Sequence, residues 1–211
     1  MSDSADALRD NDLRLAEFAR GITAAQWAEP SLCTEWTNHD VLAHLVIGYS
    51  AGVTEAAASM LRHRGSFDKA NTEMARRLAA QRNPAELIEE FSALARRPRG
   101  IGRVFPKRLL LGDHVIHELD IAYALGQECS IPASTLAAVL DTQVRVPNPF
   151  VPAAARARGL TLRATDTQWS HGTEGPTVSG QAAHLASLLG GRPWALQHVS
   201  GDGVGALCTR I

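Results

Sequence analysis

The feature that most constrains this chain is a helical segment, residues 109–125, in which three ionisable side chains share one apolar face. At 3.6 residues per turn, Asp113, His117 and Asp120 fall within roughly 60° of one another around the helix axis. Apolar residues border that arc, at Leu109, Leu110, Ile116 and Ile121. The arc is therefore expected to face the protein interior, where unpaired charge costs several kcal/mol.

A buried charged stripe needs a partner. A divalent metal held by Asp113 and His117, one turn apart and completed by ligands from another helix, is the most economical partner. Two alternatives stay open on these residues alone. One is a hydrogen-bonded Asp/His pair buried in a helix bundle, and the other is a surface ion pair between an aspartate and Arg108.

A second segment, residues 31–45, favours the metal. Thr37 and Asp40 have the spacing of a capping box, in which each side chain bonds to the other residue's backbone N–H, so a helix is predicted to begin here. Two turns later His44 lies on the apolar side of this helix. His39 points in a different direction around the helix axis and is expected to be solvated. Two helices that each direct metal-binding groups inward predict a site with three protein ligands.

Two motifs carry a family resemblance: Ser31-x-Cys33-x-x-Trp36-Thr37-x-x-Asp40-Val41-x-x-His44-Leu45, and the later Asp113-x-x-x-His117-x-x-Asp120. They resemble the DinB-like, mycothiol-dependent maleylpyruvate isomerase family of actinobacteria. The resemblance implies a four-helix bundle that binds a divalent metal, usually zinc, through His44, Asp113 and His117. It also implies mycothiol as the thiol cosubstrate. Asp113 departs from the family, whose acidic ligand is commonly the longer glutamate.

The remaining pattern predicts a mainly helical α+β protein. Apolar spacing indicates helices over residues 5–19, from 38 towards 61, and over 67–80, 84–95 and 106–125, which is typical of a bundle. After residue 146 several prolines end this pattern. An alternating stretch at 160–169, a short helix at 181–189 and a last apolar strand ending at Cys208 follow. We therefore expect a DinB-like metal-binding four-helix bundle over residues 1–146 and a small α/β module over 147–211.

The amino-acid composition limits the kinds of partner that this chain is expected to bind. With 21 basic and 22 acidic residues, the chain has no charge excess that would indicate nucleic-acid or membrane-surface binding. Neither a signal peptide nor the ~20 apolar residues of a membrane span is evident. Three widely spaced cysteines, without a Cys-x-x-Cys pair, fit a reducing compartment. We expect a cytoplasmic protein whose partner is a small electrophilic substrate.

The expected function depends on a coordination position of the metal that no protein ligand occupies. Three protein ligands leave the fourth position of zinc free, as in catalytic sites, and a thiol bound there becomes a thiolate at neutral pH. We expect an enzyme that activates mycothiol for transfer to, or isomerisation of, a small electrophile. Asp120 is the further candidate catalytic residue, either orienting an imidazole or bonding to another helix. Cys33 is a nucleophile, a ligand or an inert buried thiol.

Two other functions remain open on the sequence. A metal-dependent hydrolase would use the same position to activate water, although no general base is evident. A non-catalytic protein would use the bundle only to bind a metal or small ligand.

Overall fold

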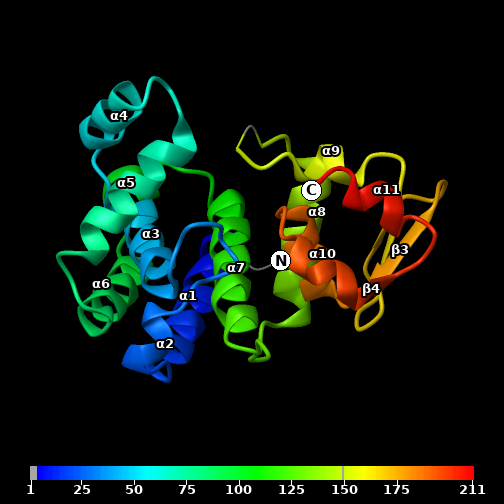
Figure 1. Ribbon diagram of the computed structural model, residues 1–211, viewed down its shortest axis with the longest axis horizontal. Coiled ribbons are helices and arrows are strands. Elements are labelled where there is room, and N and C mark those ends of the chain that lie inside the picture. The colour runs from blue at the N-terminus through cyan, green and yellow to red at the C-terminus, as the bar shows by residue number, and fades with distance from the viewer. Residues whose placement is uncertain (1–3, 149) are drawn as a thin grey trace. The chain divides into compact units, whose positions relative to one another are not determined.

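Helix α7 (Lys107–Ala124), which carries the ionisable stripe, is buried on nearly every side. It packs against α1 (Ser4–Arg20) and α3 (Asn38–Ser50), and α6 (Pro84–Arg96) packs against the same two helices. These four helices close into a ring around a common core, as Figure 1 shows. The expected four-helix bundle is therefore confirmed. Three further helices belong to this part of the chain: α2 (Ala24–Ala28), α4 (Val53–Arg62) and α5 (Phe67–Ala79).

The computed structural model describes residues 4–148 and 150–211. The chain divides into two units, Met1–Glu128 and Cys129–Ile211. This division precedes the boundary expected at residue 146, because α8 (Ala133–Arg145), which the sequence pattern did not reveal, packs against α9 (Ala153–Ala157) and α10 (Ala182–Leu189). None of the helices formed by the described residues has the length and apolar character that a membrane span requires.

The C-terminal unit is built on a four-stranded sheet in the order β2-β1-β3-β4. Strand β1 (Thr161–Ala164) runs parallel to β3 (Thr177–Gly180), while β2 (Ser170–His171) and β4 (Val199–Ser200) are antiparallel to their neighbours. Helix α10 packs on β1 and β3, and η2 (Pro193–His198) precedes β4. The α+β class predicted from the sequence is confirmed.

The last apolar segment is a helix, α11 (Val204–Cys208), and not the strand expected to end at Cys208. The chain turns sharply at Gly201, whose φ is 118° and where a Cβ would lie 2.2 Å from the carbonyl oxygen of Thr177. After this turn the backbone bonds within its own segment, and the Leu207 N–H donates to the Gly203 carbonyl at 3.0 Å. The sheet therefore ends at β4.

Helix α3 begins where the capping box predicts it. The Thr37 hydroxyl accepts from the Asp40 N–H at 3.2 Å, and the Asp40 carboxylate accepts from the Thr37 N–H at 3.0 Å. The first N–H groups of a helix lack partners within it, so these bonds fix the register in which His44 is presented.

The helix expected to run from residue 38 towards 61 is broken into α3 and α4. The N–H groups of Arg99 and Ile101, beside η1 (Gly100–Arg103), donate to the carbonyls of Tyr49 and Ala51 at 3.0 and 2.9 Å. Those are carbonyls that a continuing helix would use itself. Only glycine permits this approach at position 100, because a Cβ there would lie 2.1 Å from the Ala51 oxygen.

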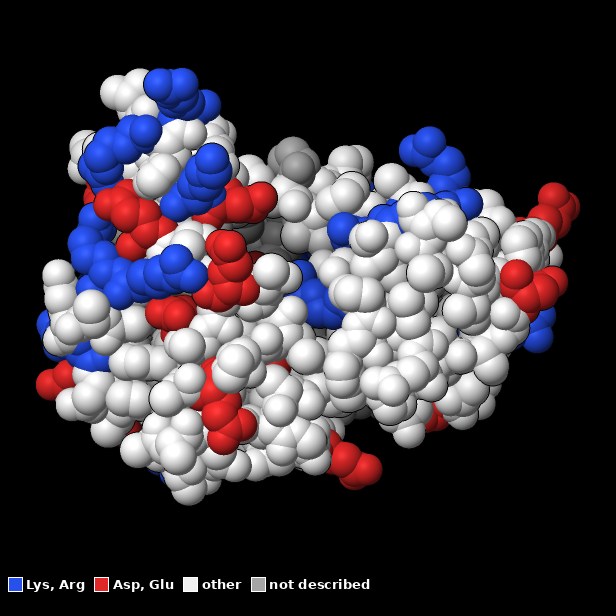
Figure 2. All heavy atoms as spheres, viewed as in Figure 1, with Lys and Arg blue, Asp and Glu red and all other residues white. Residues whose placement is uncertain are grey.

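Helices α4 and α5 are joined through the carboxylate of Glu73. It accepts from the Ser59 hydroxyl at 2.7 Å and from the guanidinium groups of Arg62 and Arg77 at 3.0 and 3.2 Å. The Ser59 hydroxyl, as the largest contributor, and the Arg62 guanidinium lower the pKa of Glu73 to about 2. Figure 2 shows acidic and basic side chains intermingled where Figure 1 places these two helices.

The Glu73 cluster gives a pH-dependent prediction. The pKa of Glu73 is lower in the folded protein than the ordinary value of 4.5. Its contribution to stability is therefore complete above pH 4.5 and lost as the pH falls towards about 2. We expect the free energy of unfolding, from urea titrations, to fall more steeply over this window in wild type than in Glu73→Gln. Equal slopes would contradict the role given to Glu73.

Candidate metal centre

Three side chains from α3 and α7 converge on one point. Nε2 of His44 lies 3.4 Å from Oδ2 of Asp113, and Nε2 of His117 lies 3.6 Å from Oδ1 of the same carboxylate. The two imidazole rings meet edge to face, with their centroids 4.8 Å apart and their planes at 71°. The structure thus brings together the three residues that the sequence resemblance selected, with their ligand atoms within 4.8 Å of one another.

These separations suit metal coordination better than direct bonding. Good N–H···O hydrogen bonds span 2.7–3.2 Å, shorter than either nitrogen-to-oxygen distance here. Zinc bonds of 2.0–2.2 Å in tetrahedral geometry place neighbouring ligand atoms about 3.3 Å apart. The nitrogens of His44 and His117 lie near this distance, each from a different oxygen of the Asp113 carboxylate. The donor set of two imidazoles and one carboxylate fits zinc.

The three side chains differ in burial. The side chains of His44 and His117 are almost fully buried, whereas that of Asp113 is 38% exposed. Burial lowers the pKa of His44, which favours the neutral ring whose nitrogen can offer a lone pair. Burial alone would raise the pKa of Asp113, but His117 and His44 together hold it below its ordinary value. The carboxylate of Asp113 is therefore the group of the three that solvent reaches.

Asp120 fixes the orientation of His117. Its Oδ2 lies 3.0 Å from Nδ1 of His117, and the aspartate is completely buried. A carboxylate only accepts hydrogen bonds, so Nδ1 is the donor in this pair and Nε2 is the ring nitrogen that faces Asp113. Of the two roles considered for Asp120, the structure shows the contact with an imidazole.

Trp36 closes the centre on the other side. Its ring stacks on that of His117, with centroids 5.9 Å apart, and is tilted against that of His44 at 5.1 Å. The indole N–H donates to the Thr72 hydroxyl on α5 at 3.1 Å, which holds the ring in place. Nδ1 of His44 is buried and has no partner among the described residues. The two histidines are therefore held differently, His117 by a carboxylate and His44 by packing.

A second buried polar group, which the sequence analysis missed, joins α1, α3 and α7. The Tyr49 hydroxyl donates to Oδ2 of Asp12, and Nδ1 of His114 lies 2.9 Å from Oδ1 of that aspartate. All three residues are at most 1% exposed. A sequence indication existed, because Asp12 interrupts the apolar spacing between Leu8 and Leu15. On α7 no such indication exists, since almost every face is buried.

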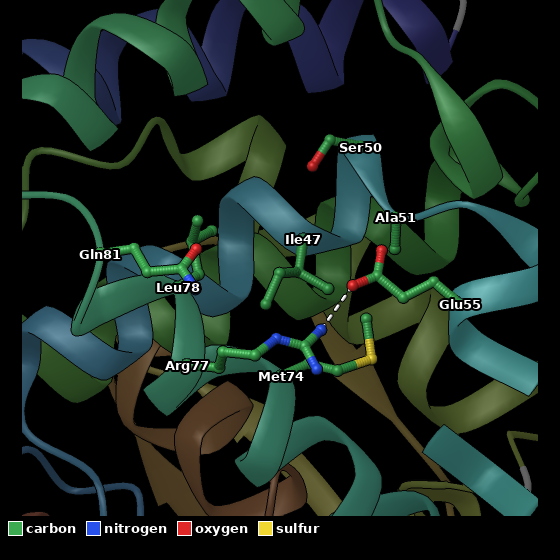
Figure 3. Close-up of a pocket in the computed structure, with 8 residues that line it drawn as sticks. All are labelled: Ile47, Ser50, Ala51, Glu55, Met74, Arg77, Leu78 and Gln81. Atoms are coloured by element: carbon green, nitrogen blue, oxygen red, sulfur yellow. Dashed lines mark hydrogen bonds and ion pairs between the residues drawn. The ribbon is translucent and has the colours of Figure 1, made fainter. Parts of the chain in front are cut away.

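A small pocket of about 130 Å³ lies between α3, α4 and α5 (Figure 3). It is lined by Ile47, Ser50, Ala51, Glu55, Met74, Arg77, Leu78 and Gln81. The guanidinium of Arg77 pairs with Glu55 at 2.5 Å, as the dashed line in Figure 3 marks. Ile47 follows His44 by about one helical turn, so the pocket lies farther along α3 than the cluster of His44, Asp113 and His117 and includes none of these three residues.

Comparison with known proteins defines the class of this chain. Residues 8–122, more than half of the sequence, match the family described as the mycothiol maleylpyruvate isomerase N-terminal domain. The chain belongs to this family, which confirms the resemblance and supports an isomerase-like enzyme. The match includes α3 and nearly all of α7, and with them every residue of the centre.

Two solved structures share the fold. One is the mycothiol-dependent maleylpyruvate isomerase, at 16% sequence identity, and the other is a histidine-to-alanine mutant of the mycothiol-dependent maleylpyruvate isomerase, at 15%. Each comparison has a TM-score of 0.60 and covers 94% of this chain and 91% of the other. A search among curated protein sequences finds no match.

The buried polar group predicts a stability effect separate from metal binding. Tyr49→Phe removes the donor to Asp12 and leaves a buried carboxylate oxygen without it, so we expect a loss of about 1–3 kcal/mol in the free energy of unfolding. Chemical denaturation of wild type and Tyr49→Phe checks this, and equal stability of the two would contradict it.

Proposed function

We propose that this chain binds zinc through His44, Asp113 and His117 and uses it to activate mycothiol. The thiol would then be transferred to a small electrophilic substrate or would assist its isomerisation. The observation that supports this best is the spacing of the three ligand atoms, because it suits a shared cation better than direct hydrogen bonds. Three protein ligands leave a coordination position open, as catalytic zinc sites do.

When bound, zinc would lower the pKa of a coordinated thiol and so supply a thiolate at neutral pH. The protein's own residues would orient the ligands and control the access of water. Asp120 would keep the lone pair of His117 Nε2 directed at the cation by retaining the proton on Nδ1. Trp36 would exclude water from the buried side, and the exposed edge at Asp113 would admit thiol and substrate.

Mycothiol is the thiol indicated by family membership, since the family and both structural neighbours carry its name. A cytoplasmic location suits a reduced thiol cosubstrate, and no disulfide joins the cysteines of the described residues. The departure at Asp113 would be accommodated by the approach of α3 to α7, which brings His44 to 3.4 Å from the shorter carboxylate.

Metal content tests the ligand assignment. We expect the purified protein to hold about one zinc per chain, and His44→Ala or His117→Ala to lower zinc affinity by about tenfold or more. His39→Ala is the matched control, because His39 lies on the same helix outside the cluster. Zinc content by mass spectrometry and helical content by circular dichroism are measured together. Undiminished zinc in a His44→Ala/His117→Ala double variant would overturn the assignment.

Thiol dependence tests the reaction. We expect electrophile turnover by the zinc-loaded protein to require mycothiol and to proceed poorly with glutathione. Asp113→Asn should reduce this turnover, because it removes a charged ligand while preserving size. Turnover of esters or amides without any thiol would establish the metal-dependent hydrolase instead. Zinc binding without turnover of any electrophile would favour the non-catalytic protein.

A further inference from the structure

His117 lies between two different groups of potential ligands. On its Nε2 side are Asp113 and His44, described above. At its Nδ1 is Asp120, and the thiol of Cys33 belongs to this second group. The Cys33 sulfur, a ring nitrogen of His117 and a carboxylate oxygen of Asp120 lie within 4.8 Å of one another. Cys33 is only partly buried, whereas His117 and Asp120 are buried.

The backbone holds Cys33 beside this pair. The N–H of the preceding Leu32 donates to the Asp120 carbonyl on α7 at 3.2 Å. The Cys33 N–H donates to the Ser31 hydroxyl at 3.1 Å, and its carbonyl accepts from the Trp36 N–H at the same distance. These bonds fix the loop directly to the helix that carries His117. The thiol therefore belongs to a built cluster and is not an isolated cysteine.

The two groups differ in their chemistry. The first offers two imidazoles and a carboxylate, while the second offers a thiol, an imidazole and a carboxylate. Thiolate is a soft ligand that favours thiophilic ions over hard cations such as Mg²⁺. We propose that Cys33, His117 and Asp120 form a second cation site, selective for a thiophilic divalent ion, that competes with the first site for His117.

The competition follows from the position of one proton. With Nδ1–H donating to Asp120, Nε2 is free for the first site. An ion that binds Cys33 and Asp120 takes the lone pair of Nδ1, so the ring proton moves to Nε2. The Cys33 thiol releases its own proton to solvent as the sulfur–metal bond forms. Nε2 then carries hydrogen and is lost to the first site, so one histidine serves only one ion at a time.

Cd²⁺ is a suitable probe, because a cadmium–thiolate bond gives an ultraviolet charge-transfer absorption. The parent for the test is the zinc-free full chain with Cys129→Ser and Cys208→Ser, in which Cys33 is the only thiol. We expect one equivalent of Cd²⁺ to produce the absorption. Cys33→Ser should abolish it and His117→Ala should weaken binding by about tenfold or more, whereas His44→Ala should retain it.

Two outcomes would overturn the proposal. One is no thiolate absorption in the parent, and the other is its loss in His44→Ala, which would place the cadmium in the first site. His117→Ala also removes the buried hydrogen bond to Asp120. A second measurement therefore uses the parent protein, in which His117 and Asp120 are unaltered: Cd²⁺ should protect Cys33 from alkylation by iodoacetamide. Equal alkylation rates with and without Cd²⁺ would overturn it.

Competition with zinc completes the test, and this part alone rests on the proposed function. Saturating zinc should raise the apparent Kd for Cd²⁺ by about tenfold or more. Zinc content of Cys33→Ser should match that of the parent, because Cys33 is absent from the first set of ligands. Failure of the cadmium absorption with normal zinc content would reject the second site and leave the proposed function standing.

Discussion

The bond between His117 and the buried carboxylate of Asp120 is the interaction on which the centre depends. Imidazole has two nitrogens that exchange roles, and only one tautomer directs a lone pair towards Asp113 and His44. A fully buried acceptor 3.0 Å from Nδ1 selects that tautomer before any ligand arrives. His117 also lies beside Asp120 and the thiol of Cys33, so one histidine belongs to two groups of potential ligands.

The rest of α7 follows a simple rule about buried charge. An unpaired polar group in the interior costs free energy, so each needs a partner within the protein. His114 pairs with Asp12, Glu118 with Arg14, and Asp120 with His117. The Nε2 atoms of His44 and His117 differ from these paired groups. They face the Asp113 oxygens at distances too long for a good hydrogen bond. A cation would complete the arrangement between these three side chains.

Local sequence rules account for much of the fold. The capping box at Thr37 and Asp40, and the spacing along residues 107–124, predict the helices that carry the centre because both depend only on neighbouring residues. The break after α3 depends instead on the N–H groups of Arg99 and Ile101, which lie far along the chain. Helix α8 and the helical ending at α11 were missed or assigned to the wrong element, since contacts within the C-terminal unit decide them.

The site was predictable to a similar extent, and for the same reason. Periodicity placed Asp113 and His117 on one face and His44 on the apolar side of another helix, and the family motif selected the three together. Periodicity cannot distinguish faces on a helix that is buried all round, so the pairing of His114 with Asp12 and Tyr49 emerged only from the structure. The loop contact that brings Cys33 to Asp120 depends on a backbone hydrogen bond between segments far apart in the chain. Sequence patterns could not predict it either.

The central claim is that the zinc accepts a thiol at its open position. Zinc X-ray absorption of the loaded protein, recorded before and after addition of mycothiol, tests it most directly. The account predicts only nitrogen and oxygen neighbours at about 2.0–2.2 Å in the resting protein, and one added sulfur at about 2.3 Å with the thiol. A sulfur already present in the resting spectrum, or an unchanged spectrum at saturating thiol, would contradict it.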